Sequence, residues 1–136
     1  MATLEGIRKF FQADRYAMFS GAEIESAGEG AAVCTMEVKD LHLNAGNVVQ
    51  GGAIFTLADF AFAVASNSGG VFTMSLNNSI SFLRSPKGKM LKAEAKPVSR
   101  GKTIAVYEVK VTDELDTLVA VMTVNGYVKG TPLPIE

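Results

Sequence analysis

The chain has 136 residues, which fits one domain and is too short for two of ordinary size. Hydrophobic residues make up 48% of it and charged residues 20%, a balance typical of a globular protein and not of a disordered one. The formal net charge of −1 gives no reason to expect a nucleic acid or a membrane surface as a partner, and one Cys with one His excludes an internal disulfide, a cysteine-based zinc site and a cluster of histidine ligands.

The first third of the chain predicts a short helix, two strands and a loop. Apolar residues near the N-terminus recur at helical spacing, which predicts an amphipathic helix over about residues 4–13. Strands are expected over residues 22–27 and 31–39, because polar and apolar residues alternate in the second and a Gly-Glu-Gly turn separates the two. Residues 40–49 are expected to form a loop.

A long apolar helix is predicted from Gly51 until it is stopped at Gly69-Gly70. It is apolar on nearly every side, with Asp59 as its only charge, so most of its surface must be buried. Four further strands follow, separated by short turns that favour antiparallel pairing of consecutive strands. They are expected over residues 71–84, 89–99, 103–112 and 118–129.

This order predicts an α+β fold: a curved antiparallel sheet of five to six strands wrapped around one long buried helix, with a short N-terminal helix. We find no repeat, linker or change of composition and expect a single domain over residues 1–136. The N-terminus lacks the features of a signal peptide, and no segment reaches the roughly 20 apolar residues that span a bilayer. We therefore expect a soluble, cytoplasmic protein.

Four runs of residues carry a resemblance to a known family. They are residues 42–46 (HLNAG), 50–63 (QGGAIFTLADFAFA), 80–84 (ISFLR) and 100–103 (RGKT). Together they resemble the hotdog-fold acyl-CoA thioesterases of the PaaI-like (phenylacetate pathway) group, within the 4-hydroxybenzoyl-CoA thioesterase superfamily. The resemblance implies a hotdog fold and hydrolysis of an acyl-CoA to free acid and CoA. Coenzyme A is then part of the substrate, and no metal or other cofactor is expected.

Asp59 is the main candidate for a catalytic residue. A carboxylate in an apolar helix is costly to bury unless it is paired, so it either faces a subunit interface or serves catalysis. The resemblance implies the catalytic role, with Asp59 either attacking the thioester carbonyl or activating water as a general base. The sequence leaves both routes open.

Gly51 and Gly52 are candidates for binding the thioester carbonyl. The first N–H groups of a helix lack intrahelical partners and lie at the positive end of its dipole, and glycine lets a carbonyl oxygen approach them. We therefore expect the Gly51 N–H to be the oxyanion donor, with Gly52 beside the substrate. The alternative is that the glycine pair only permits close packing. The family pattern has His before this pair, whereas Gln50 stands there in this chain and cannot shuttle protons.

The spacing of these two candidates predicts a shared site. Eight residues separate Gly51 from Asp59, about 12 Å of helix rise, whereas a thioester carbon must lie about 3 Å from both groups. The site should therefore combine Gly51 of one subunit with Asp59 of another. We expect a homodimer at minimum, arranged as a dimer of dimers, that is, a homotetramer.

Three further polar residues could serve either catalysis or the fold. Asn44 can orient a carbonyl or a water through its amide, or it can form an Asx-turn in its loop. Ser75 stands where some relatives carry a serine that helps to hold the nucleophilic water. His42 is expected to be a loop residue and not a base.

Basic residues at turns are candidates for binding the phosphates of CoA. They are Arg84, Arg100 and Lys102, with Gly101 and Thr103 completing the second turn. The alternative is that these charges are merely solvated. Neither a Walker-type loop nor a GxGxxG loop is present, which excludes nucleoside-triphosphate and dinucleotide sites of those kinds.

Two other functions compete with the thioesterase. A hotdog-fold protein with Gln50 in place of His can bind or sense acyl-CoA without turnover. A dehydratase acting on hydroxyacyl thioesters is less well supported, because that chemistry usually needs a His beside the carboxylate and His42 lies in a different segment from Asp59.

Overall fold

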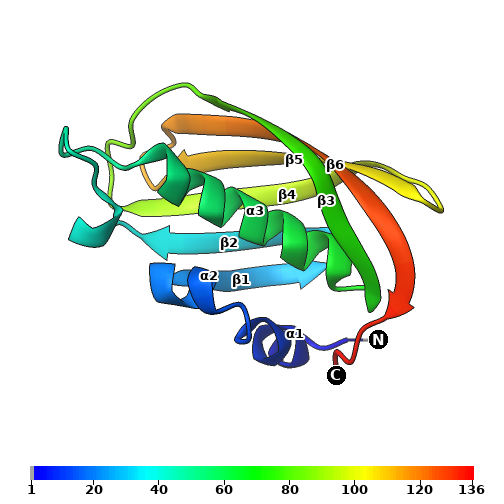
Figure 1. The fold of residues 1–136 in the computed structure, drawn as a ribbon. Coiled ribbons are helices and arrows are strands. Elements are labelled where there is room, and N and C mark those ends of the chain that lie inside the picture. The colour runs from blue at the N-terminus through cyan, green and yellow to red at the C-terminus, as the bar shows by residue number, and fades with distance from the viewer. Residues whose placement is uncertain (1) are drawn as a thin grey trace.

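We describe residues 2–136 of the protein from a computed structural model (Figure 1). A six-stranded antiparallel sheet curves around one long central helix, α3, and two short helices lie near the first strand. The elements in chain order are α1 (Leu4–Phe11), α2 (Arg15–Ser20), β1 (Ala22–Gly28), β2 (Ala31–Glu37), a 3-10 turn η1 (Asp40–His42), α3 (Gly51–Asn67), β3 (Val71–Phe82), β4 (Met90–Arg100), β5 (Ile104–Asp113) and β6 (Leu118–Pro132). This confirms the predicted fold class.

The strand order is β1-β2-β4-β5-β6-β3, and every neighbouring pair is antiparallel. Consecutive strands pair as predicted in three cases, but β3 and β4 do not. The prediction was wrong there because β4 already has β2 and β5 on its two sides, so β3 must pair with β6 at the opposite edge. Residues 83–89 carry the chain from that edge to the middle of the sheet.

The core lies between α3 and the concave face of the sheet. Leu57, Ala58 and Ala61 of α3 are fully buried, and so are Ala93 and Ala95 of β4. Small residues on the strand beneath the helix let the two backbones approach closely, as close packing of a protein interior requires. The helix is thereby held rigidly, which fixes the direction in which its uncovered face presents side chains.

Polar groups clamp the end of α3. The buried side chain of Asn67 accepts a hydrogen bond from the N–H of Thr73 at 2.7 Å and donates to the Thr73 carbonyl at 3.0 Å. These bonds tie the last turn of the helix to β3, so the helix ends at Asn67, two residues before the predicted stop at Gly69-Gly70.

Two elements are absent from the predicted order: the 3-10 turn η1, within the expected loop, and the helix α2. Asp14 caps its start by accepting a hydrogen bond from the N–H of Ala17 at 3.1 Å, and Gly21 ends it in the left-handed conformation with φ of 91°. Tyr16 and Phe19 project from it and are 70% and 74% exposed. Because its aromatic residues lie outside, α2 has no apolar periodicity by which the sequence could predict it.

Strand β3 forms one edge of the sheet and is paired only with β6 among the described residues. It is twelve residues long, and Met74, Leu76 and Phe82 on it are exposed. Within residues 2–136 no helix is long and apolar enough to cross a membrane.

Candidate active site

The predicted oxyanion donor lies where α3 begins. Gln50 is the N-cap residue, and its N–H donates to the carbonyl of His42 at 2.8 Å, which fixes the first turn to the preceding loop. A Cβ atom on Gly51 would lie 3.2 Å from Cζ of Phe82, closer than side chains normally pack. Glycine therefore lets the Phe82 ring approach the helix start, and both residues line a cavity of about 400 Å³.

Asp59 lies on the face of α3 that the sheet leaves uncovered. It is half-buried and lines a cavity of about 380 Å³ together with Asp14 and Tyr16 of the α2 region and Phe55 of α3. Burial raises the pKa of the Asp59 carboxyl, and the nearby charge of Asp14 raises it further. A half-buried carboxylate with increased proton affinity on the wall of a cavity is suited to act as a general base.

Within one chain, the two predicted halves of the site are separate. Gly51 and Asp59 line different cavities that share no lining residue. Each residue therefore lies on the wall of a cavity, but a single chain does not bring the two residues into the same cavity.

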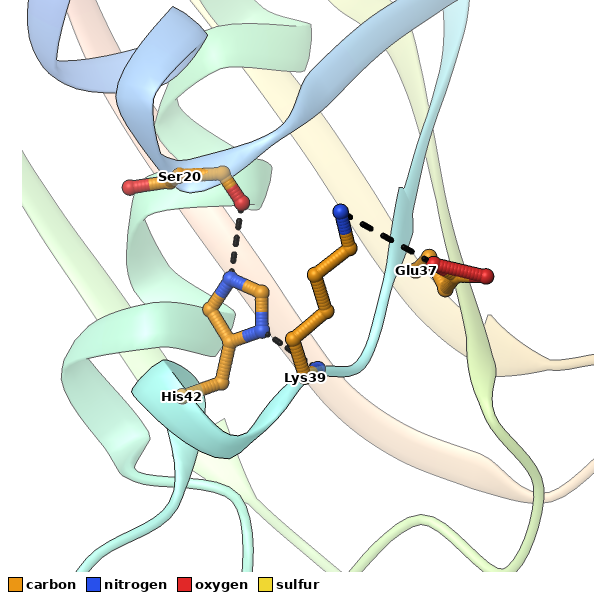
Figure 2. Close-up of polar contacts among 4 residues, drawn as sticks. All are labelled: Ser20, Glu37, Lys39 and His42. Atoms are coloured by element: carbon orange, nitrogen blue, oxygen red, sulfur yellow. Dashed lines mark hydrogen bonds and ion pairs between the residues drawn. The ribbon is translucent and has the colours of Figure 1, made fainter.

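Figure 2 shows the His42 ring hydrogen-bonded to Ser20 and to Lys39. The imidazole is buried, its Nδ1 accepts a hydrogen bond from the N–H of Lys39 at 2.9 Å, and its Nε2 donates to the carbonyl of Ser20 at 2.7 Å. These partners require the neutral tautomer with the proton on Nε2. Both ring nitrogens are occupied, so His42 does not serve as the base of a dehydratase, in agreement with its expected role as a loop residue.

Asn44 stabilises its own loop. Its Oδ1 accepts hydrogen bonds from the N–H groups of Gly46 at 2.8 Å and Val48 at 3.3 Å, the Asx-turn that the sequence left open. Nothing in these contacts tests a role for Asn44 in orienting substrate, which stays a prediction.

Gln50 lies at the start of α3, and Ser75 lies on β3. The side chain of Gln50 is exposed, makes no capping hydrogen bond, and puts Oε1 over Gly52, where an added Cβ would lie 2.9 Å from it. Ser75 is half-buried on β3, at a bulge in its pairing with β6. Bulges are frequent beside active sites because they redirect side chains, but the roles of Gln50, Gly52 and Ser75 stay predictions.

The basic residues predicted to bind CoA phosphates fall at opposite ends of α3. Arg84 lines the same cavity as Gly51. The turn at residues 100–103 lies at the other end, where the carbonyl of Ser66 accepts a hydrogen bond from Arg100. From Gly51 to Ser66 the helix rises about 22 Å, so these groups cannot surround one thioester arm within a single chain.

Arg100 also has structural partners. Its guanidinium donates to the carbonyl of Ser66 at 3.1 Å, the hydroxyl of Tyr107 at 2.9 Å and the hydroxyl of Thr73 at 3.0 Å. Arg100 thus joins α3, β3 and β5 at this end of the molecule. Substrate binding by the turn that contains Arg100, Gly101, Lys102 and Thr103 stays a prediction.

Sequence reasoning missed the contribution of α2 to the Asp59 cavity. Asp14, Tyr16 and Ala17 form part of its wall. Two local signals were present, an aspartate suited to a helix start at position 14 and a glycine suited to a helix end at position 21.

The comparisons with known proteins point to one family. The family model of the thioesterase superfamily matches residues 46–120, more than half of the chain, and the match takes in Gly51, Asp59 and Ser75. A relative from Archaeoglobus fulgidus is 44% identical over 100 residues, which are 73% of this chain and 65% of the relative, so the match spans just under two thirds of that protein. The acyl-coenzyme A thioesterase PaaI of Escherichia coli is 37% identical over 111 residues, 81% of this chain and 79% of PaaI.

Solved structures extend the likeness over nearly the whole chain. The structure of E. coli PaaI superimposes with a TM-score of 0.89 at 32% identity, covering 95% of this chain and 94% of that one. A hypothetical thioesterase from Streptococcus pneumoniae, solved with coenzyme A, superimposes with a TM-score of 0.83 at 30% identity, covering 91% and 98% of the two chains.

Proposed function

The chain belongs to the thioesterase superfamily, as a PaaI-like thioester hydrolase with the hotdog fold, and we propose that its substrates are acyl-CoA thioesters, which it hydrolyses to free acid and CoA. The observation that carries this proposal is the half-buried carboxylate of Asp59 on the uncovered face of α3, in a cavity with aromatic walls. The name of E. coli PaaI and the coenzyme A bound in the S. pneumoniae structure support CoA as the thiol part of the substrate.

We propose that the reaction needs groups from two subunits. Gly51 and Asp59 of one chain line separate cavities, and helix rise keeps them about 12 Å apart. The bare edge of β3, with its exposed apolar residues, is a surface on which a second copy can continue the sheet. A homodimer built there gives two composite sites related by symmetry. Assembly of such dimers into tetramers stays a prediction, as does a cytoplasmic location.

In such a site the chain's own groups can carry out each proton transfer. As a general base, Asp59 takes a proton from water while the oxygen attacks the thioester carbonyl carbon, and the Gly51 N–H binds the resulting oxyanion. The tetrahedral intermediate then expels the CoA thiolate, which takes the proton back from Asp59. As a nucleophile, Asp59 instead forms a mixed anhydride and releases CoA first, and water then hydrolyses the anhydride. Incorporation of ¹⁸O into Asp59 during a single turnover in H₂¹⁸O would establish the anhydride route, because solvent oxygen enters this carboxyl only when water opens the anhydride at the aspartyl carbonyl.

A second candidate function rests on Gln50. A protein that lacks the His of the family pattern at this position can bind or sense acyl-CoA without hydrolysing it. Arg84 on the wall of the Gly51 cavity provides positive charge for a CoA phosphate in either case.

Release of free thiol from a panel of acyl-CoAs tests the two functions. We expect turnover with at least one acyl group, and an Asp59→Asn variant should lower kcat by about 10²-fold or more, because the near-isosteric amide cannot accept the proton or attack the carbonyl. Binding of CoA measured by calorimetry should survive in the variant. Tight binding without thiol release from any acyl-CoA would favour the binding protein, and turnover of Asp59→Asn within a few-fold of wild type would remove Asp59 from the mechanism.

A further inference from the structure

A second carboxylate, that of Asp14, lines the same cavity as Asp59. Its position is fixed because its Oδ1 accepts the hydrogen bond from the N–H of Ala17 that caps α2, and Ala17 is itself buried. Asp14 is itself exposed, and this hydrogen bond holds one of its carboxylate oxygens at the start of α2, on the wall of the cavity.

Few other titratable or charged groups face Asp59. Asp59 is the only charged residue of α3, and among the described residues lining its cavity the only other titratable ones are Asp14 and Tyr16. Arg15 of α2 is exposed and does not line the cavity.

The titratable groups on the packed elements around α3 lie outside this cavity. At the far end of α2 the imidazole of His42 faces the carbonyl of Ser20. On the sheet beneath α3 the buried thiol of Cys34 and phenol of Tyr107 do not line the cavity either. Asp14 is therefore the charge that acts on Asp59 from within the cavity.

We propose that Asp14 is a positioning residue of the reaction, whose fixed negative charge keeps the Asp59 carboxylate a stronger proton acceptor than burial alone would make it. This inference rests on the proposed role of Asp59 as base or nucleophile. Two carboxylates that share one cavity resist being ionised together, so the one that is more buried holds its proton more tightly. The pKa of Asp59 is raised first by burial and then by Asp14, in the same direction.

A raised proton affinity of Asp59 affects the rate in opposite directions at high and at low pH. A higher proton affinity makes Asp59 a better base once it is ionised, but a larger fraction of it is protonated and inactive in acid. Removing the Asp14 charge should therefore move the acid limb of the pH profile of kcat/KM to lower pH and lower the plateau at high pH. The two profiles should cross, with the variant more active than wild type in acid.

Two substitutions remove the charge and keep the helix cap. Asn and Ser both rank with Asp as N-cap residues, so Asp14→Asn and Asp14→Ser should leave the thermal midpoint nearly unchanged. Asp14→Ala removes the cap as well and should lower the midpoint while shifting the limb equally. Glu108→Gln is the matched control, since it removes one exposed carboxylate between Tyr107 and Val109, which point their buried side chains into the core.

The experiment measures kcat/KM against pH for these four variants and, in parallel, the carboxyl ¹³C titration of Asp59, whose signal is assigned by its loss in Asp59→Asn. Crossing profiles, together with a lower titration midpoint of Asp59 in Asp14→Asn and Asp14→Ser but not in Glu108→Gln, support the proposal. An unchanged Asp59 titration in both cap-preserving variants overturns it, and so does a uniformly lowered profile with an unmoved limb. If wild type hydrolyses no thioester, the proposed function fails, but the ¹³C titration still decides whether Asp14 sets the proton affinity of Asp59.

Discussion

Asp113 accepts four backbone hydrogen bonds, whereas Asp59 accepts none among the described residues, and the pKa values of the two carboxyls move in opposite directions. The oxygens of Asp113 accept from the N–H groups of Lys87, Gly88, Leu115 and Thr117 at 2.8–2.9 Å. Burial by itself raises the pKa of Asp113, but the hydrogen bonds from Gly88, Thr117 and Lys87 outweigh it and hold the pKa below its usual range. Asp113 thus stabilises the fold, whereas no hydrogen bond from a described residue ties the Asp59 carboxyl to the fold.

Replacement of Asp113 should destabilise the protein strongly. In Asp113→Asn one oxygen becomes an NH₂ group that faces N–H donors, so a buried cluster of hydrogen bonds is broken and the free energy of unfolding should fall by about 2–4 kcal/mol at pH 7. Urea denaturation measures this. Asp116→Asn is the control in the same turn, because Asp116 is exposed and its left-handed backbone with φ of 61° suits Asn equally well.

The stability difference between wild type and Asp113→Asn should also depend on pH. The folded pKa of Asp113 lies below its unfolded value, so its contribution is fully present above about pH 4 and is lost as the pH falls through the folded pKa. The gap in unfolding free energy should therefore narrow steadily below about pH 4. A gap that stays constant down to the acid unfolding transition would show that the charge of Asp113 contributes nothing.

At the scale of elements, the sequence predicted those whose pattern reflects burial. The helix from Gly51 was predictable because its residues are apolar on nearly every side and two glycines follow it. Strand β2 was predictable from its alternating side chains, and the last four strands from the short turns between them. The family was predicted as well, because residues 42–46, 50–63, 80–84 and 100–103 resemble those of the PaaI-like thioesterases. The short α2 was not, because its aromatic residues point outward, and with it the contribution of Asp14 and Tyr16 to the Asp59 cavity was missed.

Adding a side chain at position 51, at the start of α3, should lower the activity of the protein without lowering its stability. In Gly51→Ala the new Cβ would lie 3.2 Å from Phe82, so the exposed ring must shift in the cavity while the helix backbone gains rigidity. We expect kcat/KM to fall by about tenfold or more, with an unfolding midpoint equal to or above that of wild type. Gly69→Ala is the control, because nothing lies within 4 Å of its added Cβ. Full activity of Gly51→Ala would mean that the carbonyl of the substrate does not approach this turn.

At the scale of the whole molecule, helix rise predicts a site shared between two subunits, but the sequence does not predict where the basic residues lie around that site. The sequence gives eight residues between Gly51 and Asp59, and the structure adds that the two residues line separate cavities. The sequence did not predict that Arg84 and the turn at residues 100–103 lie at opposite ends of α3. That separation follows from the opposite directions of β3 and β4: β3 ends beside the start of α3, near Arg84, and β4 runs back to end at Arg100, beside the end of α3.

Mixing two inactive variants tests the shared site. Gly51→Val should block the oxyanion position, and Asp59→Asn should remove the carboxylate supplied across the interface, so each homodimer should be nearly inactive. In a heterodimer one site collects both lesions and the other collects neither. Thiol release should then return after subunit exchange, approaching one working site per heterodimer.

Exchange must be shown independently, for example by native mass spectrometry of variants that carry different mass labels. A mixture that exchanges and stays inactive would mean that Gly51 and Asp59 do not serve one thioester across an interface.

The bare edge of β3 also bears on how the separated chain behaves. The outer side of this twelve-residue strand, where N–H and C=O groups have no partner strand among the described residues, and the exposed Met74, Leu76 and Phe82 form a template to which another extended chain can add. Disrupting assembly by mutation elsewhere would therefore produce concentration-dependent aggregation and not a well-behaved monomer. If the proposed dimer forms at this edge, a stable single chain would need lysine or proline on β3 as well, because these residues keep another strand from pairing with the edge.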